Sequence, residues 1–219
     1  MVTMNFDQEV RKRREMLYAQ VGLLLAIVLQ LSLDKSLVVG PKYVIAGLEL
    51  LLVFGIGITV PLKHSFGERL RRDFSFVLIG MISLANAASM VLVANDLIKG
   101  SDIHGRPLLF SAFAIFLTNI IIFSLWYWEL DSPGLTGIHK HDSAPKFQFP
   151  QMTFKVKETK GWEPSYFDYL YVSITNSTAF SPTDSMPMTH GAKFLMGSQA
   201  FISLLTVVLV TARAVNILG

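Results

Sequence analysis

The sequence of 219 residues contains no cysteine. A chain without cysteine forms no disulfide framework, has no thiol nucleophile and offers no thiolate ligand to a metal ion. The sequence also lacks the H-E-x-x-H, G-x-S-x-G and phosphate-loop patterns that mark common catalytic sites. We therefore expect no enzyme activity and no bound cofactor.

Histidine is scarce, with five residues in the chain. His139 and His141 stand two positions apart in a loop rich in proline and glycine, whereas His104 and His190 lie elsewhere. A metal site needs three or four ligands that converge on one ion. Two histidines in such a loop are weak evidence for one, so no metal site is expected.

Charged residues are also few, at 16% of the chain, while 52% of the residues are hydrophobic. An average soluble domain carries about 25% charged residues. The apolar residues are gathered into long runs, which is typical of an integral membrane protein. The net charge of +3 comes from basic residues beside these runs. We therefore expect a lipid bilayer as partner and no nucleic acid.

The apolar runs predict an all-α membrane protein with about five transmembrane helices and a re-entrant segment before the last one. The chain divides into a four-helix membrane region (1–130), a polar loop (131–165) and a C-terminal module (166–219). The expected spans are residues 16–33, 43–62, 74–97, 107–130 and 194–218.

Two smaller patterns predict structure near the polar loop. Residues 147–149 and 153–157 alternate polar and apolar side chains, which predicts a small surface hairpin. The aromatic cluster at residues 126–128 ends the fourth span, where tryptophan and tyrosine commonly form an interfacial belt.

Basic residues are divided unequally between the two ends of the predicted spans. One side holds the N-terminus and the loop at 63–73 with eight lysines and arginines, and the other side holds four. The positive-inside rule therefore places the N-terminus in the cytoplasm. The eight are Arg11, Lys12, Arg13, Arg14, Lys63, Arg69, Arg71 and Arg72, and the four are Lys35, Lys42, Lys99 and Arg106.

The most informative stretch runs from residue 166 to residue 218. A short aromatic segment at 166–174 is followed by a polar run at 175–184, and a long apolar helix closes the stretch. This order predicts a half-helix that enters the membrane, an extended polar turn and a full membrane helix.

That order resembles the pore module of the potassium-channel superfamily, in which a pore helix precedes a filter of the form T-V-G-Y-G-D and an inner helix. Thr178 and Asp184 fall on the threonine before the filter and the aspartate after it. A run of the P-x-T-x-G-x-K type follows, formed by Pro187, Thr189, Gly191 and Lys193.

The filter itself departs from the family pattern, because residues 179–183 read A-F-S-P-T. A carbonyl-lined filter needs glycines at alternate positions, and Pro182 fixes its own φ near −65°. The resemblance therefore implies pore architecture without potassium selectivity. The residues that it marks as filter-like are Thr175, Asn176, Ser177, Thr178, Ala179, Phe180, Ser181, Pro182, Thr183 and Asp184. The alternative is a structural turn whose polar groups satisfy freed backbone.

The chain also resembles an uncharacterised family of small bacterial membrane proteins that carry the motifs W-Y-W-E-L-D, here at 126–131, and T-A-F-S-P-T-D, here at 178–184. That resemblance implies a bacterial inner membrane and no known activity. The channel resemblance implies a homo-oligomer with the tetramer of that family, lined by the polar residues of the loop. A non-conducting scaffold or accessory subunit is one alternative. A small-solute transporter is another, although no repeated half supports it.

The charge distribution conflicts with the channel resemblance. In potassium channels the pore loop enters from outside, whereas five spans with a cytoplasmic N-terminus make this loop enter from the cytoplasm. Either the module is inverted or one span is assigned wrongly.

Ionisable residues inside the membrane are costly and need a partner or a function. Glu49 lies inside the second predicted span, and Arg213 and Asn216 lie near the end of the fifth. Five spans bring these positions to similar depth on one side, so we expect a shared polar network. It is either a structural staple or a gate on an ion path. Asn86 and Asn119 are expected to hydrogen-bond between helices.

Overall fold

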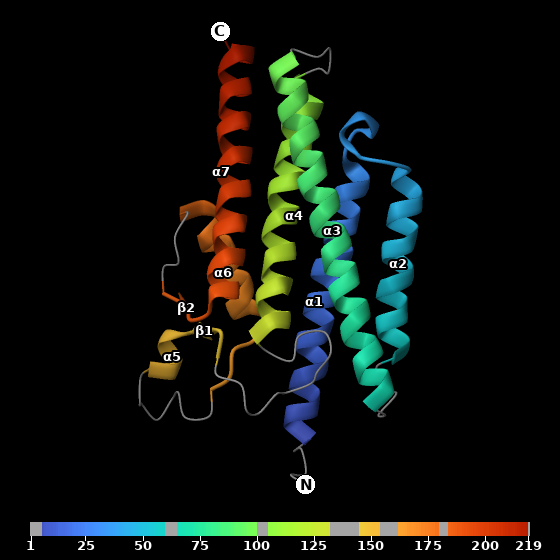
Figure 1. Cartoon of the computed structure of the whole chain (residues 1–219), viewed down its shortest axis with the longest axis vertical. Helices are drawn as coiled ribbons and strands as arrows, with labels where there is room; N and C mark the ends of the chain where they lie inside the picture. Colours follow the sequence, from blue (N-terminus) through green and yellow to red (C-terminus); the bar gives the residue numbers. More distant parts are fainter. Residues whose placement is uncertain are drawn as a thin grey trace.

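The computed structural model describes residues 6–59, 65–99, 105–131, 145–153, 162–179 and 184–218. The long helices lie roughly along one axis, so the array has a lower end, where α1 begins, and an upper end, where α7 finishes (Figure 1). The elements in chain order are α1 (Phe6–Ser32), the 3-10 helix η1 (Lys35–Leu37), α2 (Lys42–Thr59), α3 (Ser65–Lys99), α4 (Gly105–Asp131), β1 (Phe147–Gln148), α5 (Pro150–Thr153), α6 (Tyr166–Ala179), β2 (Met186–Pro187) and α7 (His190–Leu218).

Four helices in the described part of the chain are long and apolar enough to cross a membrane. The helix α4 is central, since 72% of its span is buried inside the protein, against 22% for α7. An apolar helix left largely uncovered is suited to contact with lipid. This confirms the expectation of a helical protein with long apolar helices that could cross a membrane. The four spans are Arg13–Ser32, Asp73–Leu97, Pro107–Asp131 and His190–Ala212.

The helix α2 has 18 residues and packs against α3 and α1. It connects the upper end of α1 with the lower end of α3 (Figure 1). The turn that leads into it is built by Asp34, which accepts hydrogen bonds from the backbone N–H and hydroxyl of Ser36 at 3.0 and 2.8 Å. Gly40 then takes a φ of 82°, which costs glycine little. That α2 is a fifth membrane crossing stays a prediction.

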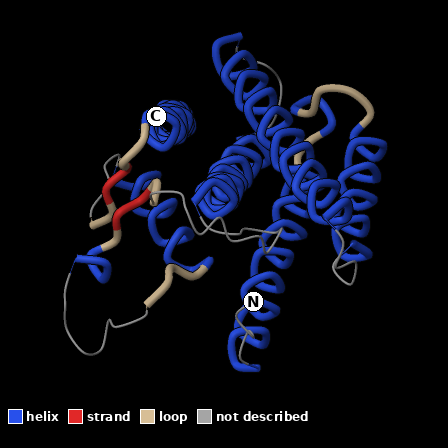
Figure 2. Tube along the Cα trace, turned by 60° about the horizontal axis from the view of Figure 1, so that its bottom comes forward, coloured by secondary structure: helices blue, strands red, loops and turns tan. Residues whose placement is uncertain are grey.

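The C-terminal third contains a helix that rises from the lower end and a chain that comes back to it. The helix α6 has 14 residues and is therefore about 21 Å long. Beyond it, Asp184 accepts a hydrogen bond from the hydroxyl of Tyr171 at 3.5 Å, near the middle of α6. The strand β2 then pairs antiparallel with β1, with Phe147 opposite Pro187. Figure 2 shows the two strands side by side at this end of the molecule. We call residues 166–187 the α6–β2 segment.

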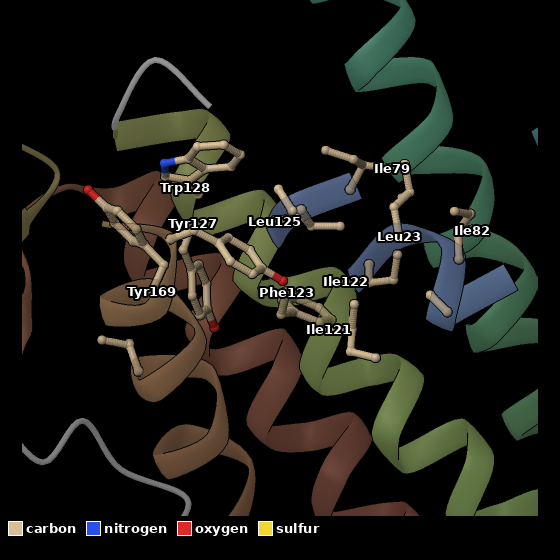
Figure 3. Packing of buried hydrophobic residues seen from close by; sticks show 14 of the residues in the cluster. Leu23, Ile79, Ile82, Ile121, Ile122, Phe123, Leu125, Tyr127, Trp128 and Tyr169 are labelled. Carbon is tan, nitrogen blue, oxygen red and sulfur yellow. The ribbon is translucent and has the colours of Figure 1, made fainter. Parts of the chain in front are cut away.

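Two clusters of buried apolar side chains hold the helices together. The larger cluster joins α1, α3 and α4, where Leu23, Ile79, Ile82 and Ile122 are at most 1% exposed (Figure 3). The second cluster lies toward the upper end and includes Leu33, Leu37, Val93, Leu108 and Ile115. Burial of each such side chain contributes about 1.5–3 kcal/mol in water, and less where the alternative is lipid.

Aromatic side chains extend the larger cluster toward α6 and β1. Tyr127 contacts Phe147 with ring centroids 5.1 Å apart, and Tyr169 contacts Phe149 at 5.3 Å in an edge-to-face arrangement. Trp128 meets Tyr166 at 5.4 Å. Tyr127 and Trp128 are therefore buried inside the protein, so the prediction of an interfacial belt is wrong for these two residues.

Several predicted boundaries are also wrong. The expected hairpin does not form as predicted, because residues 147–148 pair with 186–187. Thr153 ends α5, and residues 154–157 lie outside the described residues. The basic segment 65–73, expected in a loop, is helical and belongs to α3.

The polar run expected to be extended from residue 175 is helical as far as Ala179. Thr175 and Thr178 donate hydrogen bonds to backbone carbonyls one turn earlier, which lets hydroxyl side chains remain in a helix.

The fold predicts which residues are accessible from each side of the membrane. Single cysteines introduced as Val10→Cys, Glu163→Cys and His190→Cys in this cysteine-free chain should react with a membrane-impermeant maleimide from one side, because these exposed residues lie at the lower end. Val39→Cys, at the upper end, should react from the other side. Labelling of intact and inverted vesicles measures this, and His190→Cys sharing the side of Val39→Cys would contradict the described course of the chain.

Candidate functional site

A glutamine in the middle of the apolar helix α7 is the centre of a buried polar network. Gln199 is fully buried. Its Nε2 donates to the hydroxyls of Ser173 and Ser177 at 2.6 and 2.8 Å, and lies 3.1 Å from the carbonyl of Ser173. The two serines are four residues apart and share one face of α6. One amide group of α7 therefore binds two successive turns of α6.

The carbonyl oxygen of the same amide faces α4 as well as α6. Gln199 Oε1 accepts from the hydroxyl of Tyr127 and from Nδ2 of Asn176, the latter at 2.9 Å. Asn176 Nδ2 also donates to the backbone carbonyl of Met196 at 2.9 Å. The amide of Gln199 thus uses both its donor and its acceptor to join three helices.

Further hydrogen bonds extend this contact toward the upper end. Ser173 Oγ donates to the carbonyl of Ile120 at 2.6 Å, and Asn119 Nδ2 donates to Ser203 Oγ at 2.9 Å. The expectation that Asn119 bonds between helices is therefore confirmed. We call the following set the Gln199 network: Asn119, Tyr127, Ser173, Asn176, Ser177, Gln199 and Ser203.

The first turn of α6 is capped and tied to the lower end. Asp168 caps the start of α6, because its carboxylate accepts from the backbone N–H and the hydroxyl of Ser165 at 2.7 and 2.6 Å. The next N–H, of Tyr166, donates to Glu15 of α1 at 2.8 Å. Two carboxylates at the start of a helix also interact favourably with the positive end of its dipole. Arg11 adds a 2.7 Å hydrogen bond to the carbonyl of Glu163.

Asp131 at the end of α4 ties the chain that precedes β1 to α6. It accepts hydrogen bonds from the backbone N–H of Lys146 and from the hydroxyl of Tyr169, the latter at 2.9 Å. Phe147, next to this contact, is fully buried against Tyr169 and Tyr127. The lower half of α6 is therefore also held by hydrogen bonds and by buried aromatic rings.

The filter-like residues divide between two faces of the chain. Asn176 and Ser177 are buried in the Gln199 network. Thr178 and Ala179 are exposed, and Thr175 is half-buried with its hydroxyl on the carbonyls of its own helix. Asp184 is exposed as well. The described part of the chain does not include Phe180, Ser181, Pro182 and Thr183.

Glu49 is fully buried in α2, and neither carboxylate oxygen has a hydrogen-bond partner among the described residues. The side chains of Arg213 and Asn216 lie outside the description. The helix α2 packs chiefly on α3 and α1, whereas α7 packs on α4, α6 and α3 (Figure 1). The two helices lie on opposite sides of the array, and the shared network of Glu49 with Arg213 and Asn216 stays a prediction.

Sequence reasoning missed Gln199, Tyr127 and Ser173. The signal for Gln199 was present, since a glutamine interrupts the apolar run of α7. Tyr127 was assigned to the membrane surface because it stands between two tryptophans. The hydroxyl of Tyr127 instead donates to a buried acceptor, Gln199 Oε1, which the packing of α4 against α7 brings within reach.

No group of three or more histidine, cysteine, aspartate or glutamate side chains converges within the described ranges. His190 is exposed at the start of α7, and the other histidines discussed above, at positions 104, 139 and 141, lie outside those ranges.

Comparison with known proteins gives no relative: no family model, no curated protein and no solved structure matches this chain. Its function is therefore argued from its own geometry.

The Gln199 network predicts a specific loss of stability. Gln199→Leu should lower the free energy of unfolding by about 1–3 kcal/mol, because the hydroxyls and amide that it binds remain buried without a partner. The matched control is Gln20→Leu, at a half-buried position of α1, which should change stability by less than about 0.5 kcal/mol. Thermal unfolding in detergent measures both. Equal effects of the two substitutions would show that the network contributes nothing specific.

Proposed function

We propose that this chain is a channel-like integral membrane protein that passes ions through an axis formed by several copies of itself. The observation that carries the proposal is the α6–β2 segment. A helix of about 21 Å is shorter than the hydrocarbon core of about 30 Å, and the chain beyond it turns back to the end where it began. Irregular backbone at membrane depth is tolerated where it is covered by protein or lines a water-filled cavity.

The proposal includes five membrane crossings, with α2 as the fifth. The start of α6 then lies on the same side as the start of α1, which the hydrogen bond from Tyr166 to Glu15 supports. The excess of basic residues assigns that side to the cytoplasm of a bacterial cell, with the protein in the inner membrane. The segment therefore enters from the cytoplasm, so the pore module that it resembles is inverted here.

The outer face of α6 is the part available to line an axis. Its inner face is bound by Gln199, whereas Tyr171, Thr178 and Ala179 are exposed and Asp184 lies beside Tyr171. Hydroxyl and carboxylate groups arranged around a symmetry axis favour a hydrated cation. Without filter glycines, such a lining gives no selectivity for potassium. A homo-oligomer, with the tetramer as the proposed state, would bring these faces together.

A non-conducting scaffold or accessory subunit is the second candidate. The observation that favours it is the burial of Asn176 and Ser177, two filter-like residues, in contacts within one chain. In that case the α6–β2 segment only completes the packing of α4 and α7.

Reconstitution separates the two candidates. Purified protein in liposomes should pass monovalent cations above the leak of protein-free liposomes, and Asp184→Asn should lower that flux about 2–10-fold, because a carboxylate at the mouth concentrates cations. The control Glu163→Gln removes an exposed carboxylate at the lower end and should leave the flux unchanged. Absence of flux under any voltage or pH would overturn conduction and favour the scaffold, as would a strictly monomeric particle in mild detergent.

A further inference from the structure

A buried group of oxygen acceptors lies away from the Gln199 network. Glu49 of α2 is 0% exposed, and both of its carboxylate oxygens lack a hydrogen-bond partner within the described residues. Gln30 of α1 is 6% exposed, and its Oε1 lacks a partner in the same sense. The side chain of Gln30 lies beside the carboxylate of Glu49, and its amide N–H is the group that can donate to it. Three acceptor oxygens therefore gather between α1 and α2, with the amide N–H of Gln30 as the donor beside them.

An ionised carboxylate accepts hydrogen bonds only, and so does the carbonyl oxygen of glutamine. A buried carboxylate without a partner is costly, and such a group commonly takes up a proton. A single proton on Glu49 changes the chemistry of the pair. The protonated carboxyl group donates one hydrogen bond, for which Gln30 Oε1 is the adjacent free acceptor. One proton would therefore give Gln30 Oε1 a donor and remove the buried charge of Glu49.

Among the described residues, the charged groups on the elements packed against α2 are not placed to pair with the carboxylate of Glu49. On α1 they stand near the lower end, whereas Glu49 faces the upper part of that helix near Gln30. On α3, Asp73 and Asp96 carry the same sign as Glu49 and flank the span. Asp34 and Lys35 are exposed in the turn at the upper end, and Tyr43 on α2 is 71% exposed. The groups near the lower end of α1 are Arg11, Arg13, Arg14, Glu15 and Tyr18.

We propose that Glu49 and Gln30 form a reversible proton-binding site between α2 and α1. In the loaded state the carboxyl group of Glu49 is neutral and donates its proton to Oε1 of Gln30. Release of the proton leaves a buried charged carboxylate with the amide of Gln30 as its neighbouring donor, so the packing of α2 on α1 loosens. The site couples the contact between these helices to pH, and this holds whether or not the protein conducts ions.

A lipophilic carbodiimide tests the site directly, because it reacts with protonated carboxyl groups inside the membrane. The reconstituted full chain should be labelled at Glu49 near pH 6, where an ordinary glutamate is ionised. Labelling should fall at least tenfold by about pH 10. Mass spectrometry of the peptide that contains Glu49 measures the yield. Glu49→Gln should abolish this label, and the control Glu163→Gln should leave it unchanged.

Gln30→Leu tests the partner, because it removes both the acceptor of the proton and the amide donor beside the carboxylate, and keeps an apolar contact. The pH at which labelling is half-maximal should rise by about one unit, because the charged carboxylate loses its adjacent amide donor. An unchanged midpoint would remove Gln30 from the site. Absence of label near pH 6, or labelling that does not change up to about pH 10, would overturn the reversible proton site. Loss of label on addition of sodium chloride at constant pH would overturn it in favour of a metal cation.

Stability provides a second readout that does not depend on reactivity. The thermal midpoint of the wild-type chain should fall as the pH rises and the buried carboxyl group ionises. Glu49→Gln introduces an amide that donates to Gln30 Oε1 at every pH, so that variant should keep the midpoint of the wild type at low pH. Parallel pH profiles of the two proteins would contradict the proposal.

Discussion

The amide of Gln199 is the contact on which the arrangement of the C-terminal third depends. A helix of 14 residues cannot span a bilayer, and the polar side chains that it buries need partners inside the protein. Gln199 supplies them from the adjacent α7 by donating to Ser173 and Ser177 and accepting from Asn176. These bonds lie in a protein interior of low dielectric, where a satisfied network specifies one arrangement and an unsatisfied one is costly. The short helix α6 is therefore held beside α4 and α7, although it is too short to span a bilayer.

The lower end of α6 is fixed by different chemistry. Carboxylates of Asp168 and Glu15 satisfy the first N–H groups, and Asp131 binds Tyr169 and the backbone before β1. Aromatic rings then fill the space between α4, α6 and β1. Figure 3 shows Tyr127 and Trp128 of α4 near Tyr169 of α6. The short pairing of β1 with β2 brings the chain back to this end before α7 begins. The inner face of α6 is thus committed to packing, and only its outer face is free for a second copy of the chain or for lipid.

The sequence was sufficient for the long helices and insufficient for the contacts between them. Apolar runs with polar ends predicted α1, α3, α4 and α7, because hydrophobic length is a local property. Residues 166–218 also predicted the order of a short helix, a segment that leads back toward its start, and a long helix. The pairing of Phe147 with Pro187 was not, since strand partners far apart in sequence depend on packing. The polar side chain of Thr175 suggested a turn, although the residue lies within the helix α6. Gln199 gave no clear signal because apolar residues surround it in the sequence. Both errors concern polar side chains whose role is decided by neighbours from other helices.

The central claim is that α6 ends at depth in the membrane and not at its surface. Depth-dependent quenching tests this most directly, with one fluorophore attached through Thr178→Cys and another through Glu163→Cys in the reconstituted chain. Thr178 is exposed near the end of α6, and Glu163 precedes its start. Our account predicts that lipids with a quencher deep in the acyl chains quench the probe at position 178 much more strongly than the probe at 163. Equal quenching of both by headgroup quenchers alone would place α6 on the membrane surface and contradict the account.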